Sequence, residues 1–405
     1  MSFDQALSGL NAASSNLDVI GNNVANASTV GFKGANAIFA DVYANSLSSS
    51  ASTTAGIGVS VASVQQQFVQ GTISTTSNPL DVAINGNGFF RMDTAGQITY
   101  SRNGQFHLDK DGFIVNATGS QVTGYAVDAS GNIVASAPTP LQVSSSQLQA
   151  TMTTKAGIGL NLDSSKAVAT GAFNPTDSTT YNSSTSMSVY DSLGNSHTLA
   201  TYYAKTGANT WAVYGTMDGT ALPASLGTLT FKSDGTLDTT ATTLPFNVSD
   251  TLTNGATTPF AFTLDYSKAT QFGSSFSVDT LSQDGYTAGL LSGYNIGDDG
   301  TLQGQYSNGQ TRTLGQIALA RFTNLNGLQP LGNNEYRESS DSGQAIVGAP
   351  GSSNFGVVQS GAVEESNVDL TNQLVAMITA QRVYQANAQT IKTEDQMMNT
   401  LVTLR

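Results

Sequence analysis

The sequence of 405 residues contains no cysteine. A disulfide bond and a thiolate metal site are therefore both excluded. Two histidines, His107 and His197, are present and lie in strand-like runs far apart in the chain. A single histidine in a strand is more often structural than catalytic or metal-binding, so we expect neither a cofactor nor a metal.

Charged residues are scarce as well. They make up 11% of the sequence, against about 25% in a typical globular protein. Lysine and arginine together number 15, aspartate and glutamate number 28, and the net charge is −13. Because nucleic-acid binding needs clustered cations, this balance argues against a nucleic-acid partner.

Long apolar runs are also missing. No stretch approaches the roughly 18 consecutive apolar residues that a membrane-spanning helix needs. The start of the chain lacks the pattern of a secretory signal peptide, because the first basic residue is Lys33 and both Asp4 and Asp18 precede it. We therefore expect no membrane insertion and, for a protein that leaves the cell, export without a cleaved signal peptide.

Glycine and proline are absent after Gly361, so nothing interrupts a helix near the C-terminus. Ser366 and Asp369 resemble a capping box, which predicts a helix over residues 366–405. Positions taken in alternate steps of four and three from Leu370 are mostly apolar, as in helices that pack lengthwise. The larger apolar members are Leu370, Leu374, Met377, Tyr384, Ile391, Met398 and Val402.

The start of the chain provides a partner helix, predicted over residues 1–27 with a second capping-box pattern at Ser2 and Gln5. Its heptad positions are interrupted at Ser14 and Gly21. Its apolar members are Phe3, Leu7, Leu10, Leu17 and Val24. We call these residues and the C-terminal set the predicted seam.

The two helices could be ordinary amphipathic surface helices or a matched pair. The positions beside the C-terminal seam are mostly glutamine, asparagine, threonine and alanine. A solvated coiled coil usually carries glutamate and lysine there. This difference favours helices that are surrounded by copies of themselves.

Between the helices, the sequence predicts β structure. Turn signals such as Asn85-Gly86, Asp111-Gly112 and Asn308-Gly309 recur over residues 72–147 and 284–356, with short apolar runs between them. We expect these stretches to form one β domain. Residues 148–283 contain no glutamate and no arginine and are rich in threonine and serine, which indicates a second, inserted β domain.

Residues 29–71 and 357–363 are expected to connect the β domains to the helices, with a β-hairpin and a mobile loop over residues 45–56. The helical domain would comprise residues 1–28 and 364–405. The predicted fold is thus α+β and mostly β. Nested, sandwich-like or barrel-like β domains are looped out between paired terminal helices of coiled-coil character.

No catalytic motif is present. The sequence lacks a Gly-x-Ser-x-Gly elbow and a Gly-Lys dipeptide, which excludes the common serine-hydrolase and Walker A signatures. Asp109-Lys110-Asp111-Gly112 and Asp298-Asp299-Gly300 are read as hairpin turns, since neither has the acid of a calcium loop six residues after the glycine. Trp211, the only tryptophan, is a weak signal for a glycan-binding platform. We therefore predict that the protein is not an enzyme.

Three long motifs carry a family resemblance. Residues 23–33, 78–90 and 367–405 resemble the N-terminal signature, the opening of the first β domain and the C-terminal helix of the axial proteins of bacterial flagella. This family comprises rod, hook and hook-associated proteins. The matching N-terminal residues are Asn23, Asn26, Thr29, Gly31, Phe32 and Lys33.

Within that family, the sequences at residues 283–286, 306–310 and 327–334 are similar to hook proteins. The resemblance implies a structural subunit of a flexible tubular polymer in the hook and basal body, outside the cell. This universal joint links rod to filament and transmits motor torque. The implied partners are other copies of the chain, the distal rod protein, the hook cap, the hook–filament junction proteins and the flagellar type III export apparatus.

Other functions stay open at this point. The chain could be a distal rod protein or another axial protein of the flagellum. It could also be a surface adhesin that binds glycans through the inserted domain. An enzyme with an unfamiliar site would depend on His107 or His197.

Overall fold

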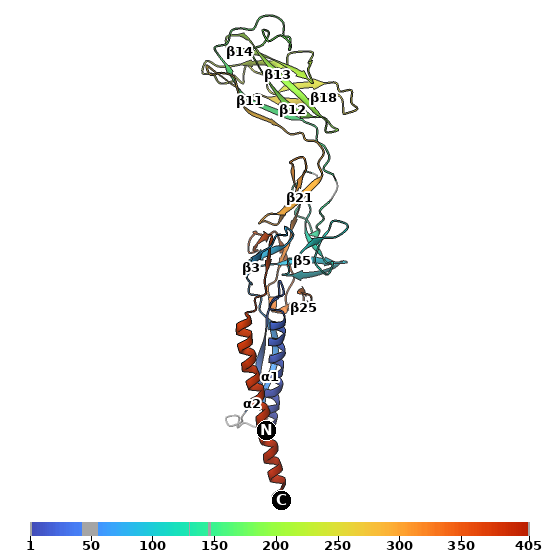
Figure 1. Cartoon of the computed structure of the whole chain (residues 1–405), viewed down its shortest axis with the longest axis vertical. Helices are drawn as coiled ribbons and strands as arrows, with labels where there is room; N and C mark the ends of the chain where they lie inside the picture. Colours follow the sequence, from blue (N-terminus) through green and yellow to red (C-terminus); the bar gives the residue numbers. More distant parts are fainter. Residues whose placement is uncertain (1, 43–55, 129, 145–146, 404–405) are drawn as a thin grey trace. The chain divides into compact units, whose positions relative to one another are not determined.

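The computed structural model describes residues 2–42, 56–128, 130–144 and 147–403. The predicted loop over residues 45–56 lies outside them except for Gly56. The chain divides into two compact units, which are described separately. Unit 1 contains Met1–Ser145, Gly293–Gln305 and Thr311–Arg405, and unit 2 contains Ser146–Ser292 and Tyr306–Gln310. The fold is mostly β, with the terminal helices packed together (Figure 1).

The helices α1 (Ser2–Ala25) and α2 (Leu370–Thr403) lie side by side in unit 1 (Figure 1). They run antiparallel, because Gly9 approaches Asn387 while Asn23 contacts Gln373. The prediction that α2 begins at Ser366 is wrong. Asp369 is the N-cap, and its Oδ1 accepts a hydrogen bond from the backbone N–H of Asn372 at 3.1 Å. Residues 366–369 are not helical, and the side chain of Asn367 among them is hydrogen-bonded to other segments, as described below.

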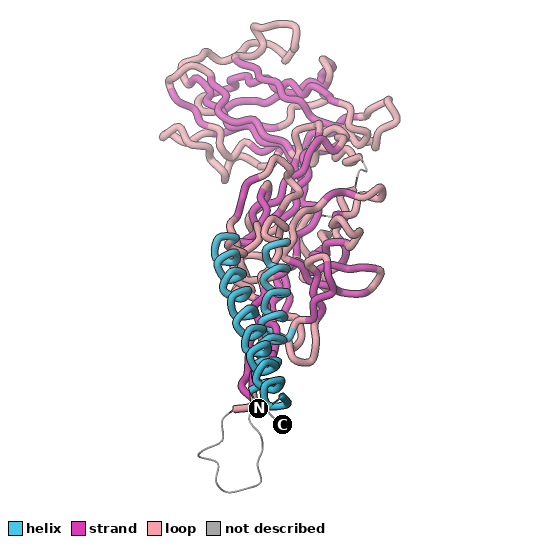
Figure 2. Tube along the Cα trace, turned by 60° about the horizontal axis from the view of Figure 1, so that its bottom comes forward, coloured by secondary structure: helices cyan, strands magenta, loops and turns pink. Residues whose placement is uncertain are grey.

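A two-stranded hairpin packs against α1 in unit 1 (Figure 2). It consists of β1 (Ala35–Val42) and β2 (Gly58–Gln66), with a register shift between Ile38 and Phe39. The backbones of α1 and β2 approach closely, since a Cβ on Gly58 would clash with the Ser8 hydroxyl. At the start of α1, the Gln5 amide donates to the Gly56 carbonyl at 2.5 Å instead of completing a capping box.

The β part of unit 1 contains a sheet with the central order β21-β22-β23-β9-β5-β6-β26-β25. Its core includes edge-to-face contacts among Phe89, Tyr100, Phe322 and Tyr336. The strands of this sheet are β5 (Phe89–Thr94), β6 (Gln97–Ser101), β7 (His107–Leu108), β8 (Ile114–Val115), β9 (Gln121–Tyr125), β10 (Thr139–Pro140), β21 (Leu291–Ile296), β22 (Thr301–Tyr306), β23 (Thr311–Ile317), β24 (Leu319–Arg321), β25 (Gln329–Gly332), β26 (Glu335–Arg337) and β27 (Ile346–Gly348).

Two short antiparallel pairs form separate two-stranded sheets. β3 (Ile73–Thr75) pairs with β29 (Ala362–Glu364), and β4 (Val82–Asn85) pairs with β28 (Val357–Ser360). The segment that precedes α2 therefore lies beside residues 73–85. Ala318 separates β23 from β24.

Unit 2 consists of two sheets that face each other across one hydrophobic core. Strand β11 pairs in parallel with β18 and β19 and antiparallel with β20. The first sheet contains β11 (Lys155–Asp163), β17 (Phe246–Asp250), β18 (Phe260–Asp265), β19 (Thr270–Phe272) and β20 (Ser277–Gln283). The second contains β12 (Ser183–Tyr190), β13 (Ser196–Gly207), β14 (Thr210–Met217), β15 (Thr220–Ala221) and β16 (Gly227–Thr230).

Trp211 lies at the centre of this core. Its side chain is fully buried, and its Nε1–H donates to the Gln271 Oε1 at 2.6 Å. A glycan-binding platform must present its ring to solvent, so Trp211 cannot serve as one. The indole stabilises unit 2 from within.

Candidate assembly interface

The motif at residues 23–33 contains the end of α1 and most of the segment that connects it to β1. The turn after α1 is closed by hydrogen bonds from Asn26 to Asn22 and from Thr29 to Asn26. Gly31 follows with φ of +71°, a conformation that favours glycine. A Cβ at this position would lie 2.6 Å from the backbone nitrogen of Asn103. The chain can therefore pass the first β domain at this distance only because residue 31 has no side chain.

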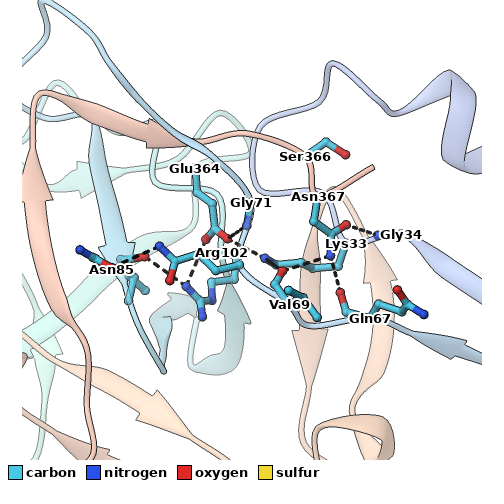
Figure 3. A network of polar contacts seen from close by, with 12 residues as sticks. Lys33, Gly34, Gln67, Val69, Gly71, Asn85, Arg102, Glu364, Ser366 and Asn367 are labelled. Atoms are coloured by element: carbon cyan, nitrogen blue, oxygen red, sulfur yellow. Dashed lines mark hydrogen bonds and ion pairs between the residues drawn. The ribbon is translucent and has the colours of Figure 1, made fainter. Parts of the chain in front are cut away.

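Lys33 directs its ammonium group into a buried ion cluster (Figure 3). Its Nζ lies 2.6 Å from Glu364 Oε1, and Arg102 Nη1 lies 3.1 Å from Glu364 Oε2. The side chains of Lys33 and Glu364 are both fully buried. We call Lys33, Arg102 and Glu364 the junction cluster. The sequence pointed to Lys33 only through the family resemblance and not to the other two residues, which no local spacing connects to it.

Two asparagines hold the backbone beside the junction cluster. Asn23 in α1 donates to the Ala35 carbonyl at 2.8 Å and accepts from the Ala35 N–H at 2.9 Å. Asn367, just before α2, accepts from the Gly34 N–H at 2.8 Å and donates to the Gln67 carbonyl at 2.6 Å (Figure 3). The ends of both helices are thus hydrogen-bonded to consecutive residues at the start of the hairpin.

The helices themselves meet through small side chains. Ala6, Ala12 and Ala13 of α1 and Ala380 of α2 are buried. At Gly9 a Cβ would lie 2.9 Å from the Asn387 Nδ2, so a larger residue there would require the asparagine side chain to move. On α2, the contacts with α1 are made by residues 373, 380 and 387. The predicted heptad positions are 374, 381 and 388, so the contact residues lie one position earlier in each case.

None of the described predicted-seam side chains is fully buried within one chain. Half-buried positions are Leu10, Leu17, Val24, Met377 and Ile391. Exposed positions are Phe3, Leu7, Leu370, Leu374, Tyr384 and Met398. The side chain of Val402 is outside the described part of the chain.

Beside the helix pair lies a groove of about 620 Å³. Apolar side chains and the small residues of the helix contact form most of its walls. Its lining residues are Gly9, Ala12, Ala13, Asn16, Phe39, Val59, Ala376, Thr379, Ala380, Val383 and Asn387. Both helices and both strands of the hairpin therefore contribute to one apolar surface.

The two histidines lie in different surroundings. His107 is exposed in β7. His197 is held between two carboxylates, with Nδ1 2.6 Å from Asp218 Oδ2 and Nε2 3.3 Å from Asp191 Oδ2. Among the described residues, no cluster of three or more potential ligands could hold a metal ion, and neither helix is long and apolar enough to cross a membrane.

Four family descriptions match successive parts of the chain. "Flagella basal body rod protein" matches residues 3–33, and "Flagellar hook protein FlgE/F/G D1 domain" matches residues 83–158. "Flagellar basal body protein FlaE D2 domain" matches residues 161–286, and "Flagellar basal body rod FlgEFG protein C-terminal" matches residues 359–404. These matches include the helices, the junction and both β regions.

Relatives that align over the whole chain are described as flagellar hook proteins. The flagellar hook protein FlgE of Escherichia coli (strain K12) is 44% identical over 412 residues, covering 100% of both chains. That of Rhizobium meliloti is 36% identical and covers 98% of this chain and 97% of its own. The crystal structure of Helicobacter pylori flagellar hook protein FlgE2 shares the fold at 16% identity, with a TM-score of 0.56, over 72% of this chain and 100% of that chain. The chain belongs to the flagellar hook protein FlgE family.

Proposed function

We propose that this flagellar hook subunit polymerises through the exposed sides of α1 and α2 and the groove beside them. The observation that carries the proposal is the exposure of the predicted seam: Leu374 is 44% exposed, Phe3 is 48% exposed and Met398 is 61% exposed. Large apolar side chains repeated along a helix gain free energy when another surface covers them. In a self-assembling subunit, that surface is supplied by further copies.

The end of α2 supports the same conclusion. The antiparallel contacts of Gly9 with Asn387 and of Asn23 with Gln373 place the start of α1 beside residue 394 or so. Residues 395–400 are all exposed and include Met397 and Met398. Within one chain, α1 is too short to cover this segment. Neighbouring helices in the polymer would bury it.

The groove suits an apolar side chain from a neighbouring helix. Gly9, Ala12 and Ala376 leave space that larger residues would fill, while Phe39 and Val383 provide apolar walls. We propose that side chains of the predicted seam from an adjacent copy enter this groove. Each helix pair would then contribute both the inserted seam side chains and the groove that accepts those of a neighbour.

A cysteine-accessibility experiment tests this proposal, and the absence of native cysteine makes any introduced thiol unique. Val383 lines the groove and is 48% exposed. A Val383→Cys variant should react rapidly with a maleimide as a free subunit and at least tenfold more slowly in assembled tubes. Depolymerised tubes serve as the control, because the thiol must react again. Equal reactivity in tubes and subunits would exclude the groove as an assembly contact.

We further propose the partners and the export route of the family for this chain: the distal rod protein, the hook cap, the hook–filament junction proteins and the type III export apparatus. On this route the chain would be exported without cleavage. Intact-mass measurement of the surface protein should find a chain that begins at Met1 or Ser2. Loss of about twenty N-terminal residues would indicate a cleaved signal instead.

A further inference from the structure

The junction cluster combines two cations with a single carboxylate. Glu364 Oε1 accepts from Lys33 Nζ at 2.6 Å and from the Gly71 backbone N–H at 2.8 Å, while Oε2 accepts from Arg102 Nη1 at 3.1 Å. The cations have neutral partners too. Lys33 donates to the Val69 carbonyl at 2.8 Å, and Arg102 Nη2 donates to the Gly86 carbonyl at 2.7 Å. The only anion in this buried group is Glu364.

Glu364 also connects the segments from which the helices and the hairpin leave the β structure. It ends β29 shortly before α2, and Lys33 lies between α1 and β1. Arg102 follows β6 of the first β domain. The backbone carbonyl of Glu364 accepts from the Gly31 N–H at 2.7 Å, which adds a contact that does not depend on the side-chain charge.

Removing different members of the cluster has unequal electrostatic consequences. Without the Glu364 charge, two buried cations would face each other with no anion. Without one cation, a one-to-one ion pair would remain. Burial lowers the pKa of Lys33, Glu364 raises it and Arg102 lowers it again, so the balance depends on the carboxylate. An uncompensated buried charge is strongly destabilising, whereas replacing a whole ion pair often is not.

We infer that Glu364 is a positioning residue for hook assembly, holding the base of both helices and the hairpin on the first β domain through its negative charge. It touches no part of the proposed groove and acts through Lys33, Arg102 and Gly71. This role concerns how one subunit presents its helices, so it stands whether or not the groove is the contact between copies.

The test is residue-resolved hydrogen exchange on the full-length chain with Glu364→Gln. Glutamine keeps the size of the side chain and removes its charge. The Gly31 and Gly71 amides should lose protection roughly a hundredfold or more, because the junction opens locally. Glu365→Gln is the matched control, since Glu365 is exposed and adjacent. Trp211 fluorescence should show the same unfolding transition in both variants, because this residue lies in unit 2.

A second variant separates charge from packing. In Glu364→Gln combined with Lys33→Met, one buried cation has been removed as well. We expect this double variant to protect Gly31 and Gly71 better than Glu364→Gln alone. If the two substitutions instead cause additive losses, the cluster acts by packing and the inference is wrong. Unchanged protection in Glu364→Gln would also overturn it. If Glu364→Gln fails to fold, the double variant must fold for the inference to hold.

Discussion

At the scale of single residues, Gly31 combines two constraints that no other amino acid meets. Its φ is +71°, and a Cβ added to it would lie 2.6 Å from the backbone nitrogen of Asn103, so both features oppose a side chain. We expect Gly31→Ala to lower the free energy of unfolding of unit 1 by at least about 2 kcal/mol. Urea denaturation followed by far-UV circular dichroism measures this change.

Gly21→Ala provides the matched control for that substitution. Gly21 lies within α1, and an added Cβ would meet no atom within 4 Å. Alanine has a higher helix propensity than glycine, so this variant should be unchanged or stabilised by up to about 1 kcal/mol. Equal destabilisation by the two substitutions would show that the position of Gly31 is not special.

His197 makes unit 2 sensitive to pH. Its imidazole is largely buried and contacts Asp218 and Asp191. Burial by itself lowers the pKa of His197, but the hydrogen bonds and charges of the two carboxylates outweigh it and raise the pKa above the ordinary value. Asp191 also accepts from Asn254 at 2.6 Å, so His197 and Asp191 together link the segments that contain Asp218 and Asn254.

The direction of the pH effect follows from this raised pKa. The stabilisation from His197 is fully present below its unfolded pKa of about 6.5 and is lost as pH rises through the higher folded pKa. Unit 2 should therefore melt at a lower temperature at pH 8 than at pH 6, and His197→Gln should remove this difference. Melting followed by Trp211 fluorescence provides the measurement. An NMR titration in which His197 titrates at or below an unfolded histidine would contradict the assignment.

At the scale of secondary-structure elements, α2 has more apolar surface than α1 can cover. Leu374 is exposed on the free chain and belongs to the predicted seam. We expect Leu374→Asp to prevent polymerisation, since burying an ionised carboxylate costs several kcal/mol. The melting temperature of the free subunit should hardly change, because the residue is exposed there. Sedimentation and electron microscopy of polymerisation mixtures measure the outcome.

Leu374→Met is the control for this prediction, because it keeps an apolar side chain of similar volume. It should polymerise like the wild type. Normal tubes from Leu374→Asp, or a large fall in the melting temperature of its free subunit, would show that Leu374 has a different role.

Several elements could be predicted from the sequence because their signals are local. The turns at Gly86, Gly112 and Gly309 have positive φ, in agreement with the Gly-containing turn signals. Both helices were predicted from their lack of breakers and their apolar spacing. The start of α2 was missed, because Ser366 and Asp369 both have the chemistry of a cap and only the contacts of Asn367 decide between them.

The junction cluster was not predictable from sequence in this way. Lys33 and Glu364 are 331 positions apart, and Arg102 is 262 positions from Glu364. Nothing in the spacing of these residues indicates contact, which arises only when β3 pairs with β29. The parallel pairing of β11 with β18 was missed for the same reason, since runs of threonine and apolar residues predict a strand but not its neighbour.

At the scale of the whole molecule, the two units have different surfaces and therefore suit different tasks. The terminal helices carry exposed leucine, valine and methionine, whereas residues 148–283 are rich in threonine and serine and lack arginine. Polar contacts of this kind exchange readily with water and contribute about 0.5–1.5 kcal/mol each. We propose that contacts between copies of the inserted domain adjust as the hook bends, while the helices keep the tube closed.

Replacing residues 148–283 with a short Gly/Ser linker tests whether the inserted domain and the helices have these different tasks. The variant should still be exported and should polymerise, since the helices, the junction and the first β domain remain. Its tubes should differ from the wild type in curvature or bending stiffness, as measured by electron microscopy, and motility should fall more than assembly. Loss of polymerisation with unit 1 still folded, or unchanged curvature and stiffness, would refute the proposal.

The pairing of helices from the two ends of the sequence also leads to an expectation about the order in which one subunit folds. Most of unit 2 is the continuous stretch Ser146–Ser292, whereas α1 and α2 come from opposite ends of the sequence. The entropic cost of closing a loop rises with its length, and contacts between distant residues form slowly. We expect Trp211 fluorescence to recover before the helical circular dichroism signal in stopped-flow refolding. A subunit whose unit 2 core has formed would then still lack the paired terminal helices. Self-association through these helices would be delayed until they have folded.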